Sequence, residues 1–223
     1  MLRPVIMIGC GGSGQKAVRY VRDNVRRRLE HSGWDGGVPQ SWRFIGLDTL
    51  NIQESPGEIP TLPAEDYESI ALRFGTYPAL TDALLAQHSP RDDSSGYREL
   101  VGWRPNPADV AVPLLAGAGQ MRAVGRIAGV LALGTVVRQK VIEAFSDCDA
   151  GGPELQRVSK HLGIPVPPGT PVPDPMVVVL GSMAGGTGAG ILLDVVDLIR
   201  RTDLRGAFPI SVIFTPDIFK ADS

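Results

Sequence analysis

The chain has 223 residues, 43% of them hydrophobic, and a formal net charge of −2, which suits one globular core and gives no electrostatic reason to expect binding to nucleic acid or to a membrane surface. No apolar run approaches the roughly 20 residues of a membrane span, and the N-terminus lacks a signal-peptide pattern, so a cytoplasmic protein is expected. Two cysteines and three isolated histidines argue against a disulfide framework and a structural zinc site.

The chain opens with a predicted strand, a glycine-rich turn and a helix. Residues 5–8 are apolar and residues 9–14 are mostly glycine. Helical spacing then predicts a buried stripe of Ala17, Val18, Val21, Val25 and Leu29, with Arg19, Arg22, Arg26, Arg27 and Arg28 mostly outward. The spacing of Gly9, Gly11 and Gly14 is also typical of a dinucleotide-binding turn.

The second predicted strand is residues 42–47, and it ends in Asp48 and Thr49. A carboxylate just beyond the second strand suits a ribose hydroxyl in a dinucleotide-binding site. It also suits a water bound to Mg²⁺, or the cap of a turn. The residues alone leave these roles open.

Residues 51–108 predict an elaborated connection, because polar, proline and glycine segments alternate there. Short helical periods occur at residues 65–74 and 77–87, and residues 89–96 have the composition of a loop. We assign this stretch no chemistry.

The third strand is predicted at residues 109–112, near an edge or an end of the sheet because Pro113 follows it. A long apolar-rich helix is predicted over residues 127–145. The proline-rich run at residues 165–173 favours an extended backbone that leads into the fourth strand.

The last part of the chain repeats the order of strand, glycine turn and helix. Residues 176–180 are a solid apolar run, residues 181–190 form the turn, and residues 191–199 have helical spacing. A fifth strand is predicted at residues 209–214.

This second glycine turn has the composition of a phosphate site. Glycines let main-chain N–H groups approach an anion closely, and the N-terminus of the following helix attracts negative charge. Thr187 can add a hydroxyl donor. The turn has no lysine, which distinguishes it from the P-loop pattern, so Mg²⁺ is the expected source of further positive charge.

Residues 184–190 closely resemble the glycine-rich signature of the tubulin/FtsZ family, which reads small residue, Gly-Gly-Thr-Gly, small residue, Gly. Residues 9–18 are similar to the first nucleotide loop of FtsZ, although Lys16 departs from its pattern. Residues 117–119 and 124–126 resemble the loop that senses the terminal phosphate in this family. Arg122 is similarly placed to a tubulin arginine, and Arg126 suits either that loop or a helix surface.

The resemblance implies an α/β fold, the three-layer, Rossmann-like, mostly parallel sheet of the tubulin nucleotide-binding domain. It implies GTP or GDP and Mg²⁺ as cofactors, with Asp48 on the metal side. FtsZ has Asn-Thr-Asp at this place, so the carboxylate of Asp48 comes earlier here. The residues implied in cofactor binding are Gly9, Cys10, Gly11, Gly12, Ser13, Gln15, Asp48, Gly117, Ala118, Gly119, Ala184, Gly185, Gly186, Thr187, Gly188 and Asp217.

By the same resemblance, residues 1–223 form one nucleotide-binding domain with insertions at about 51–108 and 146–174. The base-binding helix, the acidic catalytic loop and the C-terminal domain of the family are not in this sequence. We therefore expect a fragment of a divergent, bacterial tubulin-like protein. The full-length protein is expected to be a GTPase that self-associates into filaments, with hydrolysis completed by a neighbouring subunit. No catalytic residue is named, and the chain alone is expected to show little GTPase activity.

Two other functions stay open from the sequence. One is a nucleotide-gated scaffold that does not hydrolyse its nucleotide and contacts partners through the insertions. The other is a Rossmann oxidoreductase that binds NAD through Gly9, Gly11, Gly14 and Asp48. This second alternative leaves the later glycine turn unexplained.

Overall fold

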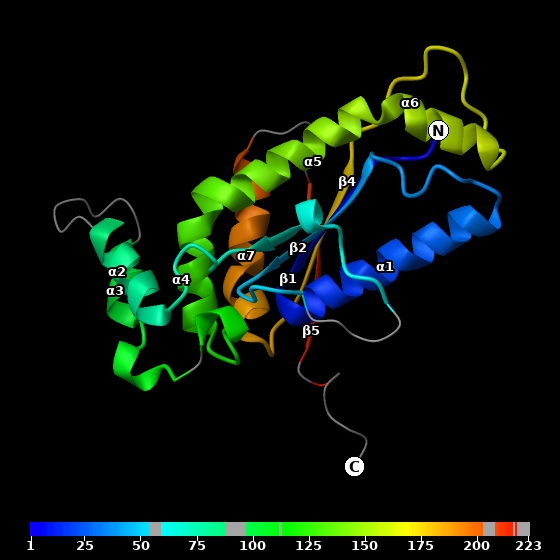
Figure 1. Cartoon of the computed structure of the whole chain (residues 1–223). Coiled ribbons are helices and arrows are strands. Elements are labelled where there is room, and N and C mark those ends of the chain that lie inside the picture. Colours follow the sequence, from blue (N-terminus) through cyan, green and yellow to red (C-terminus); the bar gives the residue numbers. More distant parts are fainter. Residues whose placement is uncertain (54–58, 88–96, 112, 203–207, 216, 218–223) are drawn as a thin grey trace.

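The computed structural model describes residues 1–53, 59–87, 97–111, 113–202, 208–215 and 217. In these residues a parallel sheet lies between helical layers (Figure 1). Its strands are β1 (Val5–Cys10), β2 (Trp42–Asp48), β3 (Tyr67–Ser69), β4 (Met176–Ser182) and β5 (Ile210–Phe214). The three-layer α/β fold expected from the sequence is therefore confirmed.

The sheet has the order β3-β2-β1-β4-β5 with every pairing parallel. The register places Cys10 opposite Leu47 on one side and opposite Gly181 on the other, so β1, β2 and β4 end at the same level. The chain moves outward from β1 through β2 to β3, then returns to the other side of β1 with β4. Ligands of open α/β sheets bind at such a reversal, beyond the carboxyl ends of the strands.

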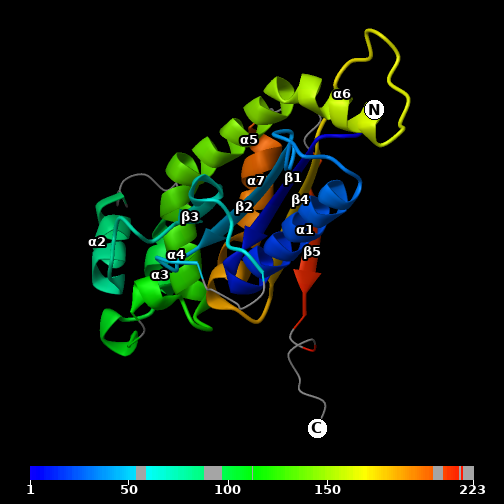
Figure 2. The same ribbon diagram turned by 45° about the vertical axis from the view of Figure 1, so that its right-hand side comes forward.

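The helices are α1 (Gly11–His31), α2 (Tyr77–Gln87), α3 (Tyr97–Trp103), α4 (Arg122–Ala132), α5 (Arg138–Ala150), α6 (Gly152–His161) and α7 (Gly186–Arg201). Helix α1 covers one face of the sheet, and α4, α5 and α7 cover the other (Figure 2). Helices α2 and α3 stand at one end of the molecule, beside α4. None of the helices in the described part of the chain combines the length and the apolar character needed to cross a membrane.

Alternation along the strands divides the core in two. Ile6, Ile8 and Val179 point toward α4, α5 and α7 and join the larger cluster. Their neighbours Met7 and Val178 point the other way and join the smaller cluster beneath α1. Strands that are buried on both faces read as continuous apolar runs, which is why residues 5–8 and 176–180 predict strands so clearly.

The third strand was predicted in the wrong place, since residues 109–111 form no strand and residue 112 lies outside the described residues. The sheet instead takes Tyr67–Ser69 as β3, inside the stretch 65–74 that was predicted to be helical. Gly46 leaves room for the ring of Tyr67, because a Cβ at Gly46 would lie 3.2 Å from the Tyr67 Cδ2 atom. Pro107–Asp109 forms a 3₁₀ turn that the Asn106 side chain caps by accepting a hydrogen bond from the Ala108 N–H.

The other predicted elements are found, most of them with shifted ends, whereas the helix at 77–87 has the predicted bounds. The helix at 77–87 is α2, and the predicted fifth strand is β5. The single helix predicted over 127–145 is instead α4 and α5 joined by a π-helical turn at Leu133–Val137. The loop predicted at 89–96 lies outside the described residues.

One face of α1 was also assigned wrongly. Arg19 is only 2% exposed, whereas Val21 is 37% exposed. The Arg19 guanidinium donates hydrogen bonds to the carbonyl oxygens of Ile59 and Pro60, at 2.9 and 3.0 Å. The segment after β2 lies over this part of α1, so a residue that periodicity places outward becomes buried and paired.

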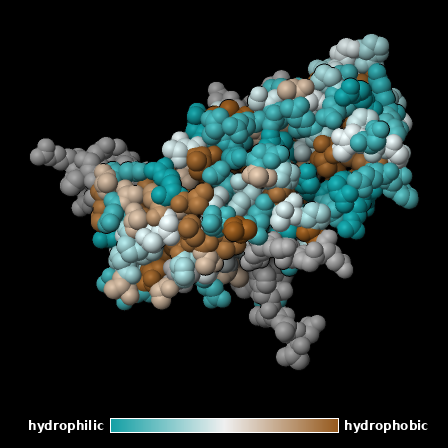
Figure 3. Space-filling model, in the orientation of Figure 1, coloured by the Kyte–Doolittle hydropathy of each residue, from teal (hydrophilic) through white to brown (hydrophobic). Residues whose placement is uncertain are grey.

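Apolar colours gather on the side of the molecule that carries α2 and α3 (Figure 3). Leu85 and Trp103 in these helices and the nearby Leu72 have exposed side chains. Strands β1, β2 and β4 and the helices that cover them bury most of their large apolar side chains. Strand β5 differs, because Ile210, Val212 and Ile213 are exposed.

Candidate functional site

Two glycine turns meet at the point where the strand order reverses. Helices α1 and α7 begin at the same end of the sheet (Figures 1 and 2), directly after the neighbouring strands β1 and β4. Gly11 has a φ of 70°, and a Cβ placed on it would lie 2.5 Å from the Gly188 nitrogen. A Cβ on Gly188 would lie 2.7 Å from the Cys10 carbonyl oxygen. The turns are in direct backbone contact, which only glycine permits.

A third loop closes the site beside α7. The Gly186 N–H donates a 2.7 Å hydrogen bond to the Gly119 carbonyl oxygen. Gly117 and Gly119 both have positive φ angles, of 110° and 55°. The loop at residues 117–119 is thereby held against the first turn of α7.

The three segments surround an open depression of about 250 Å³. Its lining residues are Cys10, Gly11, Gly12, Ser13, Asp48, Leu50, Ala116, Gly117, Ala118, Gly119, Ser182, Gly185, Gly186, Thr187 and Gly188. Most of the residues that the sequence singles out therefore share one surface, although they come from four separate parts of the chain.

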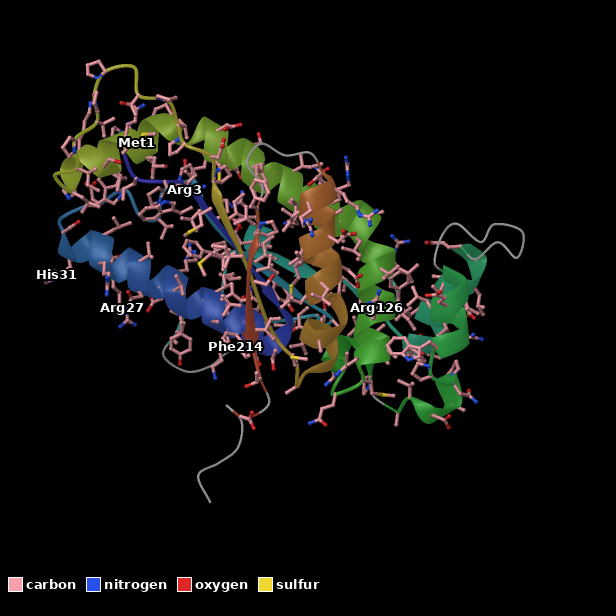
Figure 4. All side chains as sticks on the ribbon, turned by 180° about the vertical axis from the view of Figure 1, so that it is seen from behind. Met1, Arg3, Arg27, His31, Arg126 and Phe214 are labelled. Atoms are coloured by element: carbon pink, nitrogen blue, oxygen red, sulfur yellow. The ribbon has the colours of Figure 1, made fainter. Side chains whose placement is uncertain are left out.

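Four of the singled-out residues do not line this depression: Gly9, Gln15, Ala184 and Asp217. Gly9 lies beneath the first turn and Gln15 lies behind Asp48. Asp217 is exposed beyond β5, whose C-terminal end is marked by Phe214 in Figure 4. The implied ribose contact of Asp217 stays a prediction.

Sequence reasoning missed three lining residues, Leu50, Ala116 and Ser182. Leu50 follows Asp48 by two positions, Ala116 directly precedes Gly117, and Ser182 precedes Ala184 by two positions. The Ser182 hydroxyl accepts a 3.0 Å hydrogen bond from the Ala184 N–H, which shapes the start of the second turn. A polar residue at the end of a strand that enters a glycine turn is the signal that could have identified Ser182.

Asp48 supplies the carboxylate of the depression. Its Oδ1 accepts a 2.7 Å hydrogen bond from the Thr49 N–H, and its Oδ2 accepts a 2.9 Å hydrogen bond from the Gln15 amide nitrogen. Burial, together with the negative charge of Asp48, holds the pKa of the Cys10 thiol well above its usual range. Cys10 therefore stays a neutral, small lining group.

The local chemistry fits a phosphate chain. A Cβ on Gly12 would meet only the Asp48 Oδ2, at 4.0 Å, and a Cβ on Gly185 would meet nothing within 4 Å, so both turns have space above them. Neither α1 nor α7 has an acidic residue in its first turn, which leaves both positive helix ends available to an anion.

The oxygen ligands of the depression also fit Mg²⁺, if phosphate oxygens of a bound nucleotide share in its coordination. Within the described residues no group of three or more His, Cys, Asp or Glu side chains could hold a metal ion by itself. Mg²⁺ is commonly bound through one or two carboxylates, with water and substrate phosphates completing its shell. Asp48 is placed to supply such a carboxylate.

The two arginines of α4 act elsewhere. The Arg122 guanidinium donates a 2.9 Å hydrogen bond to the Met183 carbonyl oxygen, and Arg126 pairs with Asp194 of α7 at 3.3 Å. Figure 4 labels Arg126 on α4, on the side of that helix facing α7. Neither residue lines the depression. The helix-surface interpretation of Arg126 therefore describes its position better than contact with a phosphate.

The pairing of Arg126 leads to a prediction about pH. Burial raises the pKa of Asp194, the nearby Asp197 raises it further, and Arg126 opposes both. Because the folded chain then holds this proton more tightly than the unfolded chain, the free energy of unfolding should fall as pH rises from about 4. Asp194→Asn should remove this part of the slope in urea unfolding between pH 4 and 7. The exposed Asp35→Asn, which lies away from Asp194, is the control, and an unchanged slope in Asp194→Asn would contradict the assignment.

Close packing of α4 on α7 connects the third loop to the second glycine turn. A Cβ on Gly125 would lie 2.7 Å from the Thr187 Cα, and a Cβ on Gly190 would lie 2.5 Å from the Arg126 nitrogen. The two helices therefore cross with backbone against backbone. A movement of the signature turn at residues 184–190 would therefore displace α4 and the loop at residues 117–119 that precedes it.

Comparison with known proteins agrees with this geometry. A family model described as tubulin-like matches residues 6–223. No curated protein matches the chain. The match includes both glycine turns, the loop at 117–119 and all of the parallel sheet except Val5. On this evidence the chain belongs to the tubulin-like family.

Proposed function

We propose that the chain is the GTP-binding domain of a tubulin-like GTPase that self-associates into filaments. The observation that carries this proposal is the backbone contact between Gly11 and Gly188, which joins two glycine turns at one phosphate-sized depression. Membership of the tubulin-like family supports guanine nucleotide as the ligand.

The roles of the residues follow from their positions around the depression. Main-chain N–H groups of residues 11–13 and 185–188 would donate to phosphate oxygens. Asp48 would hold Mg²⁺, which when bound supplies the positive charge that a lysine supplies in other phosphate sites. The loop at residues 117–119 would contact the terminal phosphate, because it adjoins the first turn of α7.

Hydrolysis would be completed by a neighbouring subunit. Asp48 is the only carboxylate among the described residues that line the depression, and Gln15 and Thr49 already bond to both of its oxygens. A group that activates water would have to come from elsewhere, and a second subunit placed over the depression is such a source. Turnover would then depend on assembly.

One observation also suits a different cofactor. The strand order and the spacing of Gly9, Gly11 and Gly14 are those of a dinucleotide-binding fold. The second glycine turn argues against NAD as the ligand, because it occupies the space beside Gly11 and has no role in a dinucleotide-binding fold. Family membership likewise supports the guanine nucleotide.

A binding panel tests the proposal. GTP, GDP, ATP and NADH are each titrated into the chain by calorimetry, with Mg²⁺ and with EDTA. GTP and GDP are expected to bind at least about tenfold more tightly than NADH, a difference of about 1.4 kcal/mol. Tightest binding by NADH would replace the proposal with the oxidoreductase, and tighter binding of ATP than of GTP would remove guanine from it.

A further inference from the structure

A buried chain of hydrogen bonds runs behind the depression. Gln15, Asp48, Thr49 and Thr187 are each no more than 5% exposed. The Gln15 Nε2 donates to the Asp48 Oδ2 at 2.9 Å, and the Thr49 N–H donates to the Asp48 Oδ1 at 2.7 Å. The hydroxyls of Thr49 and Thr187 lie 2.9 Å apart and share a hydrogen bond. The chain therefore links α1, the end of β2 and the first turn of α7.

Two of the four residues face the depression and two do not. Asp48 and Thr187 line it, whereas Gln15 and Thr49 stand behind them. Each rear residue bonds to a lining residue, so the orientation of the lining side chains depends on groups that a ligand would not touch. Such an arrangement is common around metal sites, where outer residues orient the ligands.

The side-chain amide of Gln15 has a buried oxygen without a hydrogen-bond partner among the described residues. An ionised carboxylate only accepts hydrogen bonds, so the amide nitrogen of Gln15 faces Asp48. The amide oxygen Oε1 is then buried, and it has no hydrogen-bond partner among the described residues. An unpaired buried acceptor is costly, and in native proteins it calls for an explanation. An apolar side chain of the same length would avoid this cost, so the retained amide points to a requirement for its donor.

We propose that Gln15 is a positioning residue that holds the Asp48 carboxylate in the orientation needed for Mg²⁺ bound with nucleotide. The inference rests on the proposed function, because it concerns the same site. Gln15 acts through Asp48 and makes no contact with nucleotide. Its N–H donor restrains the Oδ2 atom, while the Thr49 N–H restrains Oδ1, so the plane of the carboxylate is set by two different elements.

The test is Gln15→Met, which keeps the length of the side chain and removes both the donor and the unpaired acceptor. The affinity for GTP is measured with Mg²⁺ and with EDTA, and the ratio of the two gives the contribution of the metal. The ratio is expected to fall at least about tenfold in the variant, as for other residues that orient metal ligands. The affinity in EDTA should stay within about twofold, because the phosphate donors are untouched.

Controls separate the possible outcomes. Asp48→Asn should lose the metal contribution whatever Gln15 does. If Gln15 serves only the packing of α1, the melting temperature of Gln15→Met changes and the ratio stays that of the wild type, which overturns the inference. If Gln15→Met does not fold, Gln15→Asn is used, since it keeps the amide but withdraws it from Asp48.

The wild-type measurements distinguish a failure of the proposed function from a failure of the role proposed for Gln15. A wild-type chain that binds no GTP, or binds it equally with Mg²⁺ and with EDTA, contradicts the proposed site itself. A wild-type chain with a clear metal contribution that Asp48→Asn removes and Gln15→Met retains contradicts only the role of Gln15.

Discussion

Gly11→Ala is expected to destabilise the fold and to abolish nucleotide binding. The backbone of Gly11 has a φ of 70°, which costs a residue with a Cβ roughly 1–2 kcal/mol. The added Cβ would also lie 2.5 Å from the Gly188 nitrogen, and such overpacking typically costs about 1–3 kcal/mol. A loss of roughly 2–5 kcal/mol in the free energy of unfolding should appear in urea titrations.

The neighbouring Gly12→Ala is the matched control. A Cβ on Gly12 would meet only the Asp48 Oδ2, at 4.0 Å, so the fold should tolerate it within about 1 kcal/mol. The methyl group would project where the phosphates are proposed to lie, and binding should weaken by about tenfold or more. Equal stability of the two variants would show that the turns do not meet as described.

Gly125→Ala should have the next largest effect, although Gly125 does not line the depression. Its Cβ would lie 2.7 Å from the Cα of Thr187 and from the carbonyl carbon of Gly186, so α4 and α7 would have to separate. We expect a loss of about 1–3 kcal/mol in the free energy of unfolding. Nucleotide affinity should also fall, because the separation displaces the signature turn from the loop at 117–119.

Gly134→Ala provides the comparison on the same helical segment. Gly134 is exposed, and a Cβ there would meet nothing within 4 Å. This variant should be as stable as the wild type, or more stable by up to about 1 kcal/mol, because alanine restricts the unfolded chain. If Gly125→Ala matches Gly134→Ala in both stability and affinity, the close crossing of α4 and α7 does not control the site.

The glycine units were predictable because their signals are local. A continuous apolar run, a glycine cluster and a helical stripe occur within about 25 residues in each case, and β1–α1 and β4–α7 follow directly from them. Strand β3 was not predictable in this way. It has only three residues, and it pairs with β2 because Gly46 makes room for Tyr67, which is a tertiary effect.

Neither the burial of Arg19 nor the chain of hydrogen bonds behind the depression could be predicted, because both depend on contacts between residues far apart in the sequence. Gln15 and Asp48 are 33 positions apart, and Thr49 and Thr187 are 138 apart. Sequence spacing carries no information about such contacts. The sequence identified Gln15 as a residue of the site, but only the fold places it behind Asp48.

The central claim is that both glycine turns hold one phosphate chain, and amide NMR tests it most directly. The ¹⁵N-labelled chain is titrated with GDP and Mg²⁺ while the signals of Gly12, Ser13, Gly185 and Gly188 are followed. The account predicts that all four move along a single binding curve, with one dissociation constant for both turns. A response confined to one turn, or two curves with different dissociation constants, would contradict it.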